Sequence, residues 1–214
     1  MIKANECRIL IDALHTDAVP PYTGSDMRLI RDVSVDYLIF THMHRDHFDA
    51  ALTVDYLERH RYTRVICGSD VQNALCLAGV DASRFVYGDK VCITSDIAVY
   101  RFSTRHIGAK YANTEHYSFI ISTSPSLLIA GDASPILSNF SGVTADVAIV
   151  PFAYAMTVAA FRIIRDVIRP MAAVIVHLPE PSADPDGLNG QILCGIDTRG
   201  IDIYRPLIGE TVIL

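Results

Sequence analysis

Short apolar runs recur along this chain, and each stops at a polar or glycine-containing cluster. Runs of about five residues rich in Ile, Val and aromatic side chains are typical of buried strands. Segments with apolar residues three to four positions apart follow some of these runs and predict helices. The fold must therefore bury several strands and cover them with helices. In the first part of the chain the predicted strands are 8–12, 36–40 and 64–68.

Polar residues and helix breakers mark the ends of three predicted helices. Asp49 and Ser69 have the side chains of helix N-caps, and Gly79 follows the last apolar position of the second helix. Pro170 stops the third helix because its ring cannot continue the backbone hydrogen bonding. The predicted helices cover 49–61, 69–78 and 157–169.

Beyond residue 84, short apolar runs are separated by a few turn-prone residues, which predicts an antiparallel meander. In each half of the chain strands lead into helices, which favours two packed sheets with helices outside. We treat 1–214 as a single domain, with a long loop at Pro179–Gly190 beside its functional face. The meander strands are 84–87, 90–93, 97–102, 116–123 and 126–131, and the later strands are 146–152, 172–177, 201–205 and 210–214.

Composition indicates a compact cytoplasmic protein. Half of the 214 residues are hydrophobic and 20% are charged. The net charge of −6, with no basic stripe, disfavours nucleic acid as a partner. The five cysteines form no Cys-x-x-Cys pair, which predicts reduced, buried thiols.

The longest apolar stretch, Val147–Phe161, is too short for a membrane-spanning helix. It has 15 residues, against the roughly 20 that a spanning helix needs, and Pro151 divides it. The first ten residues, MIKANECRIL, lack the long apolar segment of a signal peptide. We therefore predict no membrane segment and a cytoplasmic location.

The segment THMHRDHFD places three histidines and two aspartates in nine positions, directly after a predicted strand. Imidazole and carboxylate groups together suit divalent ions such as Zn, Mn, Fe, Co or Ni. A catalytic site for one metal usually has three protein ligands and a water molecule, so four candidate ligands in six residues indicate two metals. These candidates are His42, His44, Asp46 and His47.

Three further candidate ligands stand where later apolar runs give way to polar residues. They are His106, Asp132 and His177, at spacings of 59, 26 and 45 residues from His47 onward. The motif His-x-His-x-Asp-His with these three residues resembles the metallo-β-lactamase superfamily, most closely its small lactonase-like and general metal-dependent hydrolase branch. The resemblance covers nearly the whole chain.

The resemblance implies a four-layer αββα sandwich (α/β, or α+β, class) and assigns the ligands. One metal would be held by His42, His44 and His106. The second would be held by Asp46, His47 and His177, and Asp132 would bridge the two ions. Asp46 and Asp132 would also take part in catalysis. Asp12, which ends the run RILID, matches a position that braces the histidine loop.

Such a ligand set predicts a hydrolase. A hydroxide bridging two divalent ions would attack an ester, lactone or phosphodiester of a small, anionic substrate. Zinc is the first choice of metal, with manganese, iron or nickel as alternatives. Two other functions stay open: an iron-dependent redox enzyme (a dioxygenase or a diiron protein) and a non-catalytic, metal-stabilised binding module.

Only seven residues precede RILID, so the first strand is short or missing. A homo-oligomer would cover the sheet edge that this leaves exposed.

Several residues near the predicted ligands are candidates for substrate binding. The candidate substrate residues are Arg105, Lys110, Tyr111, His116 and Tyr154. Two alternatives stay open: His116 could instead support the metal ligands from behind, and Tyr154, close to Pro151, could instead pack in the core.

Overall fold

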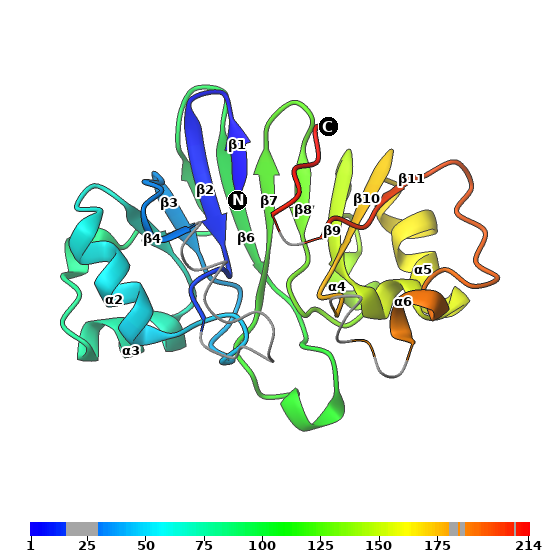
Figure 1. Cartoon of the computed structure of the whole chain (residues 1–214), viewed down its shortest axis with the longest axis horizontal. Coiled ribbons are helices and arrows are strands. Elements are labelled where there is room, and N and C mark those ends of the chain that lie inside the picture. Colours follow the sequence, from blue (N-terminus) through cyan, green and yellow to red (C-terminus); the bar gives the residue numbers. More distant parts are fainter. Residues whose placement is uncertain (16–29, 180–183, 185–186, 208) are drawn as a thin grey trace.

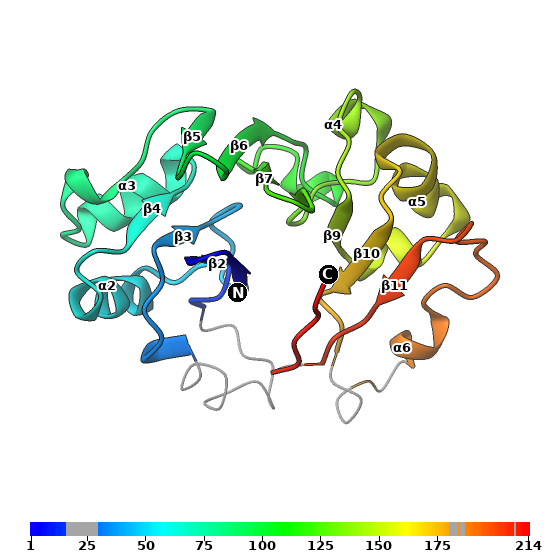
Figure 2. The ribbon, with the colours of Figure 1, turned by 90° about the horizontal axis from the view of Figure 1, so that it is seen from above.

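Two β-sheets face each other, and helices cover the outer face of each (Figures 1 and 2). The computed structural model describes residues 1–15, 30–179, 184, 187–207 and 209–214. The smaller sheet has the order β1-β2-β3-β4, and the larger has the order β11-β10-β9-β8-β7-β6-β5. The αββα sandwich is thereby confirmed. The smaller sheet contains β1 (Ile2–Ala4), β2 (Cys7–Ile11), β3 (Tyr37–Ile39) and β4 (Arg64–Ile66). The larger contains β5 (Lys90–Cys92), β6 (Ala98–Ser103), β7 (Tyr117–Ser122), β8 (Leu127–Ile129), β9 (Val147–Pro151), β10 (Ala172–Val176) and β11 (Asp202–Tyr204).

Alternation of side chains along the strands builds three layers of core. In β3 and the residue after it, Ile39 faces the other sheet, whereas Leu38 and Phe40 face the helices. In β10, Val174 points inward and Ile175 points outward in the same way. Both faces of these strands are buried, which is why they are continuously apolar in sequence.

The helices lie on the two outer faces. In α2, Asp49 is the N-cap, as predicted, and its carboxylate accepts a hydrogen bond from the Leu52 N–H at 2.8 Å. The predicted third helix is also present, but its second half has the wider hydrogen bonding of a π-helix and ends at Arg169 in the left-handed region. The helices are α2 (Ala50–Arg59), α3 (Ser69–Leu77), α4 (Leu137–Phe140), α5 (Val158–Arg162), η4 (Ile163–Ile168) and α6 (Leu188–Gln191). The short 3₁₀ turns are η1 (Ala82–Arg84), η2 (Ala109–Tyr111) and η3 (Phe152–Ala155).

The N-cap predicted for α3 is wrong, because capping comes from elsewhere in the chain. Ser69 is the first helical residue and Gly68 is the N-cap. Glu115, from the connection between β6 and β7, accepts hydrogen bonds from the Asp70 N–H and the Ser69 hydroxyl. A side chain at Gly68 would collide with Glu115. A long-range contact therefore replaces the local cap.

Two predicted strands are wrong. Residues 84–87 contribute only an isolated bridge from Phe85 to Val65, and residues 210–214 are not paired as a strand. The rest of the antiparallel meander, β5 to β8, is confirmed. The predicted loop at 179–190 lies partly outside the described residues. Its end forms the start of α6, where Asp184 accepts hydrogen bonds from the Leu188 and Asn189 N–H groups.

The cysteines agree only in part with the prediction. All five are free, but Cys76, Cys92 and Cys194 are exposed, whereas Cys7 and Cys67 are buried. Among the described residues, no helix is long and apolar enough to cross a membrane.

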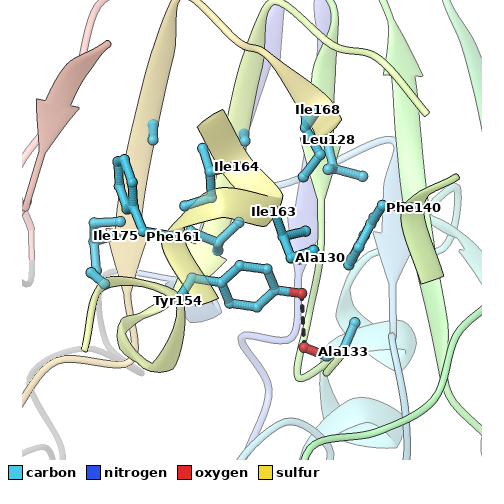
Figure 3. Packing of buried hydrophobic residues seen from close by; sticks show 14 of the residues in the cluster. Leu128, Ala130, Ala133, Phe140, Tyr154, Phe161, Ile163, Ile164, Ile168 and Ile175 are labelled. Atoms are coloured by element: carbon cyan, nitrogen blue, oxygen red, sulfur yellow. Dashed lines mark hydrogen bonds between the residues drawn. The ribbon is translucent and has the colours of Figure 1, made fainter. Parts of the chain in front are cut away.

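Tyr154 lies inside the core between the larger sheet and its helices (Figure 3). The side chain is fully buried, and its hydroxyl donates a hydrogen bond to the Ala133 carbonyl at 2.8 Å. Burial raises the pKa of this phenol well above its ordinary value, so the hydroxyl keeps its proton. The prediction that Tyr154 contacts a substrate is therefore not supported by its position. Instead, Tyr154 fixes the loop that follows β8.

Replacing Tyr154 with Phe should lower the free energy of unfolding by about 1–2 kcal/mol, because the Ala133 carbonyl loses its donor inside the core. Tyr62→Phe, at a side chain that is 96% exposed, is the matched control and should leave stability unchanged. Urea denaturation of the two variants measures the difference. Equal stability of both variants would contradict the structural role of this hydrogen bond.

Candidate metal centre

Polar side chains from several strand ends meet at one edge of the sandwich. Strands β2 and β3 run parallel in one sheet, and β8 and β10 have the same direction in the other, as does β6. The carboxyl ends of parallel strands lie at the same edge of a sheet. The residues that follow these ends are Asp12 after β2, His42 to His47 after β3, His106 after β6, Asp132 after β8 and His177 after β10.

The predicted ligands form two groups. In each group the candidate ligand atoms lie within 4.8 Å of one another, close enough to hold a metal ion. The first group is His42, His44 and His106, and the second is Asp46, His47, Asp132 and His177.

The Asp132 carboxylate lies between the two groups. Its Oδ2 is 3.7 Å from His106 Nε2 in the first group and 3.5 Å from His47 Nε2 in the second. Its Oδ1 is 3.7 Å from His177 Nε2. This position matches the bridging role that the resemblance implies for Asp132.

Asp12 holds the histidine loop against the end of β2. Its carboxylate accepts hydrogen bonds from the Thr41 N–H at 2.8 Å, the Thr41 hydroxyl at 2.6 Å and His47 Nδ1 at 2.9 Å. Asp12 makes these contacts with its backbone in the left-handed region, at φ 46°. The bracing contacts expected of Asp12 are therefore present.

Hydrogen bonds fix the proton positions on three of the imidazole rings. The Thr41 hydroxyl donates to Asp12, so it must accept from His42 Nδ1, 2.9 Å away. His106 Nδ1 donates to the Ile107 carbonyl at 2.6 Å, and His47 Nδ1 donates to Asp12. In neutral His42 and His106, each Nε2 is then left with a free lone pair.

The Nε2 atoms lie close together in pairs. His42 Nε2 and His106 Nε2 are 3.2 Å apart, and His47 Nε2 and His177 Nε2 are 3.0 Å apart. Two neutral acceptors this close repel each other unless a cation or proton lies nearby. Imidazole and carboxylate donors in this arrangement fit a divalent metal ion in each group.

Charges within the centre shift the pKa values of its groups in opposite directions. Burial lowers the pKa of His42, and the neighbouring His47 lowers it further. Burial alone would lower the pKa of His47, but the carboxylates of Asp12 and Asp132 outweigh it and raise the pKa to about 10. Burial would raise the pKa of Asp132, but hydrogen bonding and charge from His47 hold it below its usual range.

Of the remaining predicted site residues, one lies against the first ligand group, two are exposed and one is buried. Tyr111 lies against the first group, with its ring centre 4.7 Å from that of His44 and 5.0 Å from that of His106. Arg105 and Lys110 are exposed, and the Lys110 ammonium lies 4.6 Å from the Tyr111 ring centre. His116 is buried and accepts a hydrogen bond from the Asp132 N–H, so a substrate contact is not supported by its position.

Sequence reasoning missed Thr41, which links Asp12 to His42. The sequence does carry a signal for this role, because Thr41 is a hydroxyl residue between the apolar run that ends at Phe40 and the first histidine, His42.

No family model matches this chain, and no curated protein matches it. Solved structures do match: a metallo-β-lactamase fold protein, YhfI, from Bacillus subtilis superposes with a TM-score of 0.56 at 15% identity, over 83% of this chain and 79% of that one. The chain has the metallo-β-lactamase fold.

Other structures with this fold carry different chemistry. Igni18, a metallo hydrolase from Ignicoccus hospitalis, matches with a TM-score of 0.65 at 17% identity, over 98% of this chain and 91% of that one. CmlA, a diiron β-hydroxylase from Streptomyces venezuelae, matches with a TM-score of 0.64 at 14% identity, over 96% of this chain and 50% of that one. The metallo-β-lactamase fold is thus shared, and function must be argued from the site.

Asp12→Ala should lower the free energy of unfolding by about 2–5 kcal/mol, because the Thr41 N–H and His47 Nδ1 each lose a buried acceptor. Asp36→Ala is the control, since Asp36 also accepts a hydrogen bond from a neighbouring strand, from the Arg8 N–H, but at an exposed position. Chemical denaturation compares the two. An Asp12 variant no less stable than the Asp36 variant would contradict the bracing role.

Metal-free protein should lose stability as the pH rises. The pKa of His47 is about 10 in the folded protein and near 6.5 in the unfolded chain, so its stabilising effect is complete below about pH 6.5 and disappears as the pH passes through about 10. Denaturation of chelator-treated protein between pH 6.5 and 10 measures this loss. His47→Gln should flatten the pH dependence, and the same slope in variant and wild type would refute the assignment.

Proposed function

We propose that this protein is a hydrolase that uses two divalent metal ions to cleave an ester, a lactone or a phosphodiester. The observation that carries the proposal is the position of the Asp132 carboxylate, within 3.7 Å of histidine nitrogens from both ligand groups. A single metal site would not need two such groups on either side of one carboxylate.

Each group would hold one ion. His42, His44 and His106 would bind the first metal, and Asp46, His47 and His177 the second, with Asp132 shared between them. We propose zinc, with manganese, iron or nickel as alternatives that the same donors accept. When bound, the ions would activate water and polarise the bond to be cleaved.

The exposure of the ligand side chains indicates from which side a substrate can reach the centre. The side chains of His47 and His106 are only 4% and 3% exposed, whereas those of Asp46 and His177 are 42% and 36% exposed. The centre is therefore open to solvent on the side of Asp46 and His177. We expect the substrate to enter there.

We further propose a small anionic substrate. Two divalent ions exceed the charge of Asp46 and Asp132, so the loaded centre would be positive. Arg105 and Lys110 are exposed near His106, and neither forms an ion pair with another described residue. They would attract an anionic group, and Tyr111 would form an aromatic wall beside the first metal.

Assays of metal-loaded protein against esters, lactones and phosphodiesters test this function. His42→Ala and Asp132→Ala should each lower the best kcat/KM by about 10³-fold or more, because the metal-dependent stabilisation of the transition state is lost. His60→Ala is the control, since the His60 ring packs on Tyr56 of α2 and forms its hydrogen bond with the Arg31 carbonyl, and it belongs to neither ligand group. Full hydrolysis by the Asp132 variant would refute the proposal.

An iron-dependent redox function is the second candidate, because a diiron hydroxylase shares the fold. Oxygen consumption by iron-loaded protein, with no hydrolysis by the zinc-loaded or manganese-loaded forms, would favour it over the hydrolase.

A further inference from the structure

His116 contacts the backbone of the residue that lies between the two ligand groups. It directly precedes β7, and Asp132 follows the neighbouring strand β8. His116 is 2% exposed, and its Nε2 accepts a hydrogen bond from the Asp132 N–H at 3.0 Å. This nitrogen is thereby occupied, so His116 is neither placed to touch substrate nor free to bind a metal through Nε2.

A chain of buried hydroxyl groups fixes which nitrogen of His116 carries the proton. The Ser118 hydroxyl donates to the Ala130 carbonyl at 2.8 Å, so Ser118 must accept from the Thr104 hydroxyl, 3.0 Å away. The Thr104 oxygen then accepts from His116 Nδ1 at 2.8 Å. Nδ1 carries the hydrogen, and Nε2 is left as an acceptor for Asp132.

The network holds both ends of one tight turn. Ala130 and Asp132 flank Gly131, which has φ +56°, in the left-handed region that favours glycine. A Cβ at Gly131 would lie 2.9 Å from His116 Nε2 and 2.8 Å from Thr41 Cγ2. The turn is therefore packed between His116 and the start of the histidine loop, with little room to shift.

We propose that His116 is a positioning residue that sets the place of the Asp132 carboxylate between the two ligand groups. The inference rests on the proposed function, in which Asp132 bridges two metals. Outer partners of metal ligands commonly act in this way, and their loss weakens metal binding.

Two amide variants separate the contacts of the ring. In His116→Gln the side-chain oxygen reaches the place of Nε2 and can still accept from the Asp132 N–H. In His116→Asn the shorter side chain reaches only the place of Nδ1, near Thr104, and leaves the Asp132 N–H without an acceptor. Ser126→Ala is the stability control, because it removes the two hydrogen bonds of the Ser126 hydroxyl at the opposite end of β8: the one it donates to the Asp146 carboxylate and the one it accepts from the Asp146 N–H.

The test measures zinc affinity of the full chain by competition with a chromophoric chelator, alongside the melting temperature of the metal-free protein. We expect His116→Asn to weaken zinc binding by about 10- to 100-fold, His116→Gln to restore most of it, and Ser126→Ala to lower only the melting temperature. In wild-type protein, a scalar coupling across the hydrogen bond between the Asp132 amide nitrogen and His116 Nε2 should be detectable by NMR.

The outcomes distinguish the two proposals. Wild-type protein that binds no zinc, manganese, iron or nickel would contradict the proposed function itself. Wild-type protein that binds metal, with His116→Asn binding equally tightly, would overturn the positioning role alone. If His116→Asn does not fold, two other results would overturn the positioning role. One is the absence of the NMR coupling in wild-type protein. The other is a His116→Gln variant that folds but binds metal as weakly as Asp132→Ala.

Discussion

The central strands are buried on both faces, and this burial decides where polar side chains can lie in the fold. Strands such as β3 and β10 pack against the other sheet on one side and against helices on the other. They can carry no polar side chain along their length without losing a hydrogen-bonding partner. Polar chemistry is therefore confined to the residues after the strands, and the shared strand direction gathers these residues at one edge.

At that edge, hydrogen bonds and backbone conformation together fix the imidazole rings. Asp12 and His177 both hold left-handed backbone conformations that cost non-glycine residues of the order of 1–3 kcal/mol. The contacts of the Asp12 carboxylate with Thr41 and His47 offset this cost. The result is that the Nε2 atoms of both ligand groups are held around the Asp132 carboxylate before any ion arrives, which favours tight metal binding.

Much of this arrangement could be predicted from the sequence, because the information is local. Apolar runs ending in histidine or aspartate marked His106, Asp132 and His177, and the cap of α2 at Asp49 follows from its side chain. The capping of α3 could not be predicted in this way, since the N-cap Gly68 has no side chain and the acceptor for the Asp70 N–H is Glu115, 45 residues along the chain. For Tyr154 and His116 the sequence leaves two roles open each, and only their burial and hydrogen bonds in the fold favour contacts with loops over contacts with a substrate.

In the proposed function, one chain holds two metal ions across the Asp132 carboxylate. Elemental analysis of protein purified without chelator, then saturated with zinc and freed of excess metal, measures this stoichiometry. We expect close to two zinc ions per chain in wild type, with a marked loss in Asp132→Ala. A saturated wild-type protein with one ion or none per chain would contradict it.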